Sequence, residues 1–241
     1  MKNLRFLTVF ILLNLILKIQ GQDVINNNGY NKIYYPNGKL SSEGYMRNGQ
    51  PDGYWKTYFP TGIIKSEGNR KNHLLDSIWI FYNEAGDTLQ KVSYIMGKKN
   101  GFTVSYNASQ TQDPLSRGKV ISRELFVNDK REGVSLFYYP DGKIKEEVQF
   151  SNNKRHGMAR EFDRDGKLIT LQRFNNGVLV ERERINRYDE QGLKQGVWKT
   201  YYPNGRIKSE INYKDDLLNG PYKEYDENGN VSCYFSMPRV C

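Results

Sequence analysis

A short phrase recurs along this chain and constrains its fold more than any other feature. Residues 34–44 read YYPNGKLSSEG, and related phrases begin at residues 58, 138 and 201. With Gly53 as position 0 of a repeat, the aromatic residue before the turn stands at +5 and the turn glycine at +9. Most repeats start 24 residues apart, and two gaps are longer, at 32 and 39 residues. A fixed period of this length predicts a repeat architecture. The repeats start at Gly29, Gly53, Ser77, Gly101, Gly133, Gly157, Gly196 and Gly220.

Large side chains favour the odd positions of the repeat, which predicts strands. Position +5 is aromatic in every repeat, and position +1 is apolar or aromatic if Pro221 is counted as apolar. Position +17 is large and apolar in every repeat except the second, where Arg70 stands. Successive strand side chains point to opposite faces, so this period of two predicts strand, turn and strand in each repeat. We expect the odd positions to face a thin core.

The turn residues predict a hairpin with a three-residue loop at +7, +8 and +9. Proline suits the first loop position of a type I turn, asparagine or aspartate the second, and glycine the left-handed position that follows. Such a loop places odd positions opposite odd positions and keeps the apolar stripe on one face. The predicted cross-strand pairs are Tyr34 with Leu40, Tyr58 with Ile64, Tyr138 with Ile144, and Tyr201 with Ile207.

Successive hairpins predict an all-β fold, an elongated twisted antiparallel sheet built from tandem hairpin repeats. An apolar content of only 37% fits a thin core better than a globular one. Two stretches interrupt the period. Residues 107–120 predict a longer loop, and residues 178–195, which contain their own YDEQG turn, predict an extra strand at a seam. The predicted organisation is a signal peptide at 1–21, an N-terminal array at 22–181 and a C-terminal array at 182–241.

The N-terminus has the pattern of an export signal. Lys2 and Arg5 precede an apolar run over residues 6–17, which is shorter than the roughly 20 residues that a spanning helix needs. We expect cleavage between Gly21 and Asp23 and a periplasmic, cell-surface or secreted protein; an uncleaved membrane anchor is the alternative. Removing residues 1–21 lowers the net charge from +9 to +6, because the segment holds three basic residues and no acid. A mild basic excess in a field of both signs does not favour nucleic-acid binding.

The repeated phrase resembles the MORN repeat, and more closely the variant found in the YwqK-type antitoxin component family. The second repeat carries the resemblance in Gly53, Trp55, Pro60 and KSEG at 65–68, together with Tyr58, Phe59 and Gly62. The seventh repeat carries it again in Gly196, Trp198, Tyr201, Tyr202, Pro203, Gly205 and KSE at 208–210. The resemblance covers about residues 29–241. It implies a protein-binding module without a family-wide catalytic residue, and the antitoxin family implies neutralisation of a toxin as its role.

The residues that usually carry chemistry form no catalytic constellation in the sequence. His73 and His156 fall in polar connections between repeats, and no cysteine or second histidine is near either of them. Glutamates recur at +14, where a ladder of exposed ion pairs with nearby lysines is expected rather than a paired-carboxylate site. These residues are Glu43, Glu67, Glu147 and Glu210, beside Lys39, Lys65, Lys145 and Lys208. We predict no enzyme activity, no cofactor and no metal site.

The two cysteines leave one question open. Cys233 and Cys241 lie at the C-terminus, and an oxidising compartment would permit a disulfide that pins the last strand. Two free thiols on a frayed end are the alternative.

Aromatic residues at the even positions are the candidate partner-binding residues. All three tryptophans stand at +2. Such a face has either a second packing layer or an exposed binding strip, and tryptophan and tyrosine dominate binding hot spots. The alternative is that these rings pack on one another and on lysine stems. The candidates are Trp55, Phe59, Trp79, Phe81, Phe137, Tyr139, Trp198 and Tyr202.

Together these features predict a non-catalytic, exported repeat protein that acts as a protein-binding scaffold. An antitoxin or immunity-type component is the more specific form that the resemblance implies. The expected partner is a protein, and under that form it is a toxin. An envelope-surface binder of glycan or anionic lipid is the alternative, because stacked aromatic rings with a mild positive charge suit both ligands.

Overall fold

The computed structural model describes residues 25–108 and 116–236, and throughout these ranges the chain is built from antiparallel strands without an α-helix. The all-β prediction is confirmed. The predicted signal peptide and Cys241 lie outside the described residues. Within the described ranges the chain has no helix long and apolar enough to cross a membrane.

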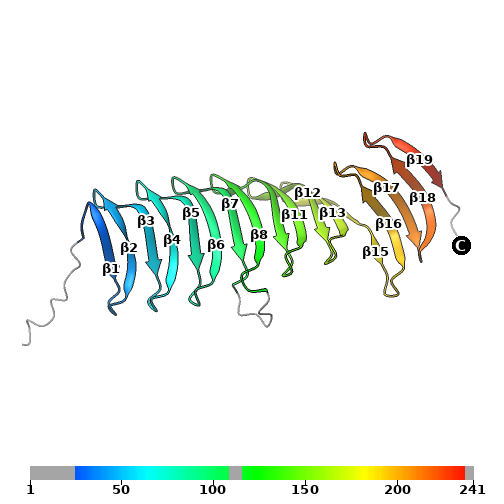
Figure 1. The fold of residues 1–241 in the computed structure, drawn as a ribbon. Coiled ribbons are helices and arrows are strands. Elements are labelled where there is room, and N and C mark those ends of the chain that lie inside the picture. The colour runs from blue at the N-terminus through cyan, green and yellow to red at the C-terminus, as the bar shows by residue number, and fades with distance from the viewer. Residues whose placement is uncertain (1–24, 109–115, 237–241) are drawn as a thin grey trace, which may run out of the picture. The chain divides into compact units, whose positions relative to one another are not determined.

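The chain divides into two compact units. Unit 1 contains five strands that pair in chain order: β1 (Gly29–Tyr34), β2 (Leu40–Arg47), β3 (Gln50–Tyr58), β4 (Ile64–Lys71) and β5 (Leu74–Tyr82). The next strand, β6 (Thr88–Ile95), is shared, since residues 88–93 belong to unit 2 and residues 94 and 95 to unit 1. Figure 1 shows each hairpin of unit 1 beside the next one.

Unit 2 holds the remaining strands in two sheets. The first runs through β7 (Lys98–Tyr106), β8 (Val120–Val127), β10 (Gly133–Tyr138), β11 (Ile144–Ser151), β12 (Lys154–Phe162), β13 (Leu168–Asn175) and β14 (Val178–Arg184), and the short β9 (Lys130–Arg131) also pairs with β8. The second is five-stranded, with β15 (Arg187–Tyr188), β16 (Lys194–Tyr201), β17 (Ile207–Lys214), β18 (Leu217–Tyr225) and β19 (Val231–Ser236) in that order.

The predicted hairpin turn is confirmed. In the first hairpin the Tyr35 N–H donates to the Lys39 carbonyl at 2.8 Å, and the Gly38 N–H donates to the Tyr35 carbonyl at 2.9 Å. Gly38 has φ +80°, the left-handed conformation that favours glycine. The closing pairs are those expected from the three-residue loop: Tyr34 with Leu40, Tyr58 with Ile64, Tyr138 with Ile144, and Tyr201 with Ile207.

Beyond the closing pair, each hairpin carries a bulge that changes which positions share a face. In the first hairpin Tyr34 pairs with Leu40 but Ile33 pairs with Ser42, so Ser41 is an extra residue on β2. One extra residue moves the rest of a strand to the opposite face. Positions +13, +15 and +17 therefore lie on the face of position +2. The extra residues in three other hairpins are Lys65, Lys145 and Lys208.

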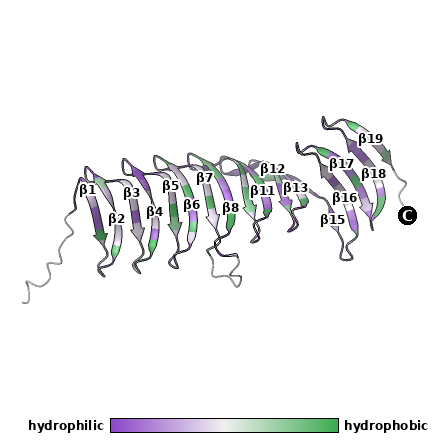
Figure 2. Cartoon of the chain, viewed as in Figure 1, coloured by the Kyte–Doolittle hydropathy of each residue, from purple (hydrophilic) through white to green (hydrophobic). Residues whose placement is uncertain are grey.

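The core consequently lies on the face opposite to the one predicted for the first strand of each hairpin. Trp55 is 4% exposed and Trp79 is 2% exposed, whereas Tyr34, placed in the core by the sequence pattern, is 46% exposed. The expectation that all odd positions face the core is wrong for position +1 and for Tyr34, because the bulge is invisible to a period-two count; the other residues at +5 are half-buried. Figure 2 shows apolar and polar residues interspersed along the strands, as a thin core requires.

Neighbouring hairpins interlock through side chains of complementary size at positions +15 and +2. Gly44 pairs with Trp55 and Gly68 pairs with Trp79, so each indole occupies the space that the glycine leaves. Each indole N–H also donates at 2.7 Å to the carbonyl of the residue that follows that glycine. In later hairpins medium-sized side chains replace this combination, as in the buried pair of Val148 and Ala159.

Where the turn phrase has a second tyrosine, it also joins its hairpin to the next one. The Tyr35 hydroxyl donates to the Tyr58 carbonyl at 2.6 Å, and the Lys39 ammonium donates to the Thr61 carbonyl at 2.7 Å. The bond of the second tyrosine recurs from Tyr139 to Phe162 and from Tyr202 to Tyr225. The recurrence of YYPNG thus has a structural reason, since its side chains satisfy carbonyls one turn along.

The boundary between the two sheets of unit 2 is held by Asn186. Its N–H donates to Val197, its side-chain amide donates to Leu168 at 2.9 Å and to Lys199 at 3.3 Å, and its side-chain oxygen accepts the Lys199 N–H at 2.8 Å. Asn186 is 6% exposed, and the preceding Ile185 is fully buried. The strand pairing ends between β14 and β15, and the hydrogen bonds of this one side chain take its place.

Candidate interaction surface

None of the eight predicted partner-binding aromatic residues is exposed in the structure. Trp55 and Trp79 are core residues, as described above, and Phe81 packs against Trp79 with ring centroids 6.3 Å apart. Phe137 packs against the buried cluster of Val148, Phe150 and Ala159. These contacts favour the alternative in which the rings pack on one another.

The other four candidates support basic side chains or turns. Lysine ammonium groups lie over Phe59, Tyr139 and Tyr202 at 5.7, 5.9 and 5.8 Å from the ring centroids, and two of these phenols bond the next turn. Trp198 meets Tyr188 edge-on at 5.0 Å, and the Lys167 ammonium lies 3.7 Å from its ring. A role for these eight residues in binding stays a prediction, and their visible role is packing.

A row of exposed apolar side chains lies instead on the opposite face of the strands of unit 1. We call Tyr30, Tyr45, Tyr54 and Ile78 the outer row; they stand at positions +1 and +16 and are 46, 58, 47 and 58% exposed. Tyr30 pairs with Tyr45 across the first hairpin, and their rings meet edge-to-face at 5.1 Å. The sequence does indicate this row, because position +1 is apolar or aromatic in every repeat. Without the bulge, however, position +1 is assigned to the core face.

Glutamates at position +14 lie on the same outer face and fix tyrosines beside the row. Glu43 accepts a hydrogen bond from the Tyr58 hydroxyl at 2.5 Å, and Glu67 accepts one from Tyr82 at 2.6 Å. The Tyr58 bond, which outweighs burial, holds the pKa of Glu43 below its usual value. Burial and the nearby Glu67 carboxylate raise the pKa of Tyr54 to about 12. Burial also raises the pKa of Tyr58, so Tyr54 and Tyr58 are neutral donors at physiological pH.

The predicted ladder of glutamates and lysines exists, but with different partners. Glu43 lies 3.9 Å from Lys32 and Glu67 lies 4.0 Å from Lys56, both at position +3 of the same hairpin. In the later hairpins Glu147 pairs with Arg160 at 3.3 Å and Glu210 with Lys199 at 3.3 Å. The lysines that we expected to be partners lie elsewhere, because the bulge turns Lys65, Lys145 and Lys208 toward the aromatic rings named above, and Lys39 reaches the next turn.

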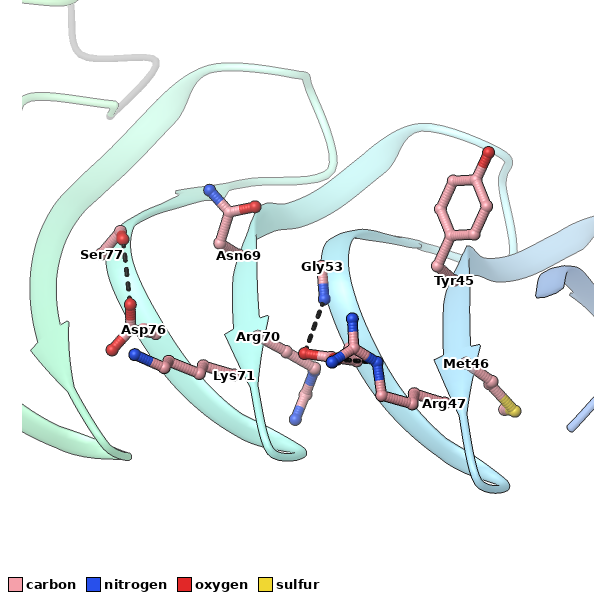
Figure 3. A pocket seen from close by; sticks show the side chains of 10 residues that line it. Tyr45, Met46, Arg47, Gly53, Asn69, Arg70, Lys71, Asp76 and Ser77 are labelled. Carbon is pink, nitrogen blue, oxygen red and sulfur yellow. Dashed lines mark hydrogen bonds and ion pairs between the residues drawn. The ribbon is translucent and has the colours of Figure 1, made fainter. Parts of the chain in front are cut away.

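An open pocket adjoins the outer row at Tyr45, and its lining includes three basic and two acidic side chains. Figure 3 shows Arg47, Arg70 and Lys71 near the turn ends of their strands. Arg47 is paired with Asp52 at 3.0 Å, and the Gly53 N–H donates to the same carboxylate at 3.2 Å. Arg70 stacks on the Trp79 ring at 5.3 Å and donates to the His73 carbonyl at 2.7 Å. The pocket holds no pair of groups arranged for nucleophilic or acid–base catalysis.

The histidines and Cys233 lie on strands or in a turn between strands. His73 belongs to the two-residue turn between β4 and β5, where its φ is +59°. His156 does not lie in a turn as predicted, because Asn152 and Asn153 form that turn and His156 is the third residue of β12. Cys233 is a free, half-buried thiol on β19, and its predicted partner lies beyond the described residues. No group of three or more metal-ligating side chains occurs in the part of the chain that the structure describes.

Comparison with known proteins finds the repeat in five places. Residues 27–48, 51–72, 131–152, 194–215 and 218–233 match the family model described as "MORN repeat variant". No curated protein matches the chain. A solved structure titled "Crystal Structure of TcdB2-TccC3-Cdc42" aligns at 13% sequence identity and a TM-score of 0.16, and the alignment covers 88% of this chain and 14% of that chain.

The four full-length matched segments have the hairpin geometry described above. Each contains the bulged turn and its closing pair, as at Tyr34 with Leu40 and Tyr201 with Ile207. Five segments of this chain thus match the MORN repeat variant, and the hairpin is the structural unit of that match.

Proposed function

We propose that this chain is a non-enzymatic scaffold that binds a protein partner through the outer row. The observation that carries the proposal is the exposure of Tyr30, Tyr45, Tyr54 and Ile78, each about half open to solvent on one face of unit 1. Contiguous exposed apolar side chains mark interaction sites, and tyrosine is enriched among the residues that carry binding energy. MORN repeats are generally protein- or membrane-binding modules.

We also propose that the chain meets its partner outside the cytoplasm. The charged start, the apolar run and the small residue Gly21 near the expected cleavage site support export, so the partner is an envelope or extracellular protein. The resemblance to antitoxin components supports an immunity-type role in which that partner is a toxin. The neutral, hydrogen-bonding phenols beside Glu43 and Glu67 suit a protein surface that offers both apolar and polar groups.

The test is capture followed by reconstitution. The native chain is used to recover a stoichiometric partner from envelope extract, and the purified pair is measured by isothermal titration calorimetry. A variant with Tyr45→Thr, Tyr54→Thr and Ile78→Thr keeps strand-favouring residues and removes the rings and the branched apolar side chain. We expect it to bind at least about 10-fold more weakly, since a few central residues carry most of an interface's energy.

The matched control changes equally exposed apolar residues outside the row. Val178, Leu217 and Val231 are 67, 60 and 56% exposed, and their replacement by threonine leaves affinity within about twofold, the range of near-neutral positions. Equal affinity of the row variant and the native chain contradicts the proposal. Binding to anionic vesicles or to cell-wall polysaccharide that depends on the same row, without any protein partner, also contradicts it and favours the surface-binding alternative.

A further inference from the structure

Arg70 breaks the pattern of its own repeat. Position +17 holds a large apolar side chain in the other described repeats, and one hairpin earlier Met46 fills it. At both places the side chain lies opposite the first glycine of the repeat, since Met46 pairs with Gly29 and Arg70 with Gly53. A charged group therefore stands where the other repeats have an apolar one, at a half-buried position.

The Arg70 guanidinium has no anionic partner. Among the residues that the structure describes, no carboxylate oxygen lies within 4.0 Å of it, and burial lowers its pKa. The two other half-buried ring-stacked arginines are compensated: Arg131 lies over Phe150 and pairs with Glu124 at 3.2 Å, and Arg155 lies over Phe174 and pairs with Glu146 at 3.0 Å. Two further ring-stacked arginines, Arg123 and Arg164, are exposed, so water solvates their charges. A half-buried charge is costly unless it is paired, so Arg70 lacks the anion that its counterparts have.

The surroundings of Arg70 form a site that an anion can enter. Trp79, only 2% exposed, supplies a buried floor beneath the guanidinium, and one Nη of that group donates to the His73 carbonyl. A guanidinium presents five N–H donors, so a fork of donors remains available toward the open pocket. Figure 3 shows this side of the pocket, with Arg47 and Lys71 on either side of Arg70 in the view.

The charges around the pocket select the kind of anion. Arg47 is neutralised by Asp52, while Asp76 is held by the Ser77 hydroxyl and by the Met96 N–H. Counting all the lining side chains, three positive and two negative charges leave a net charge of +1. A singly charged group balances this, whereas a doubly charged phosphate leaves an excess negative charge beside two aspartates. We propose that the Arg70 pocket binds one carboxylate group, held bidentately by Arg70 on the Trp79 floor.

The test uses free acetate, so that it does not depend on the proposed protein partner. The full chain is titrated with sodium acetate against sodium chloride of equal ionic strength, and the Arg70 Nε–H and Trp79 Nε1–H signals are followed by nuclear magnetic resonance. We expect saturable shifts of both signals with acetate and not with chloride. Inorganic phosphate is the second arm, and we expect weaker binding than for acetate.

Three variants make the site falsifiable. Arg70→Met places the methionine of the preceding hairpin at the same position, so it is expected to fold, and the Trp79 shift should lose its saturation. Arg70→Lys keeps the charge without the fork and should bind about 10-fold more weakly, because two parallel charge-assisted bonds become one. Arg155→Met removes a guanidinium stacked at the same 5.3 Å but already paired, and should leave acetate binding unchanged.

Several results would overturn the assignment. An unsaturable acetate response, or one that survives Arg70→Met in a folded protein, removes the site. Tighter binding of phosphate than of acetate contradicts the choice of a carboxylate. Equal weakening by Arg155→Met shows a general charge effect. None of these results bears on capture of a partner by the outer row, so the two proposals fail independently.

Discussion

The indole of Trp55 lies against the backbone of Gly44, so close that a β-carbon on residue 44 would stand 2.5 Å from the ring. The same indole donates to the Tyr45 carbonyl at 2.7 Å. Gly68 and Trp79 repeat the arrangement one hairpin later, with 2.6 Å between the corresponding atoms. The first three hairpins are thus joined by glycine and tryptophan, and neither residue can change alone without a cost.

The first prediction replaces the pair of Gly44 and Trp55 with the pair of residues that a later hairpin has at the same two positions. Gly44→Val alone forces the indole away and should lower the free energy of unfolding by about 1–3 kcal/mol or more. Trp55→Ala alone removes a buried ring and should cost about 3–5 kcal/mol. The double variant recreates the pair of Val148 and Ala159, and should be more stable than the sum of the single effects implies. Urea unfolding of the four proteins measures the coupling.

Additive losses in that cycle would show that the two residues do not share one space. Gly44 is a suitable site for this test because its φ is not positive, so the new side chain meets the indole and not a backbone restriction.

The second prediction concerns the hydroxyl that joins neighbouring turns. Tyr35→Phe removes the bond to the Tyr58 carbonyl and should lower the free energy of unfolding by about 1 kcal/mol, the usual net value of such a bond. Tyr34→Phe is the control, since this neighbouring ring is 46% exposed. Equal stability of the two variants in thermal unfolding would contradict the role given to the second tyrosine of the repeated phrase.

The third prediction is a loss of stability in alkali. Burial and the Glu67 carboxylate raise the pKa of Tyr54 to about 12, and burial with the bond to Glu67 raises the pKa of Tyr82. The folded state thus favours the neutral phenols. Their contribution is complete below the unfolded pKa of about 10 and is lost as pH rises through the folded values. The free energy of unfolding should therefore fall above about pH 10.

Denaturant unfolding at several alkaline pH values, with absorbance titration of the phenols, checks this dependence. In Glu67→Gln both phenols should titrate closer to their ordinary pKa, so the alkaline decline should become shallower. A decline of unchanged slope in that variant would show that Glu67 is not its source.

The fourth prediction tests the boundary at Asn186. Asn186→Ala removes the side-chain bonds to Leu168 and Lys199 from a buried position and should destabilise the fold by about 2 kcal/mol. Asn176→Ala is a close control, because Asn176 is exposed and also has a positive φ, 49° against 54°. Hydrogen exchange should accelerate in β16–β19 for the first variant. Similar losses for both variants would attribute the effect to the backbone conformation alone.

Much of this fold could be predicted from sequence because the decisive signals are local. Pro36, Asn37 and Gly38 occupy three positions of a bulged turn, each for a backbone reason, and the predicted closing pair of Tyr34 and Leu40 is the observed one. The period then repeats that local information along the chain. The all-β class and the hairpin unit follow from these two observations.

The face of the sheet on which each side chain lies could not be predicted, because a single extra residue in the strand determines it. Ser41 is an ordinary strand residue in the sequence, yet as an extra residue on β2 it moves everything after it to the other face. The tryptophans thereby become core and Tyr45 and Tyr54 become surface. The pairing of Gly44 with Trp55 was a usable signal, since a strand glycine often marks a close approach. Asn186 gave no comparable signal, because its contacts join distant residues.

Side-chain footprinting of the native complex shows whether the partner covers the outer row. Hydroxyl radicals modify exposed rings, and mass spectrometry reads the extent at each residue with and without the purified partner. We expect Tyr45 and Tyr54 to become protected in the complex, while the buried Trp55 and Trp79 stay unmodified in both states. Unchanged modification of Tyr45 and Tyr54 in a saturated complex, with protection at other residues, would contradict it.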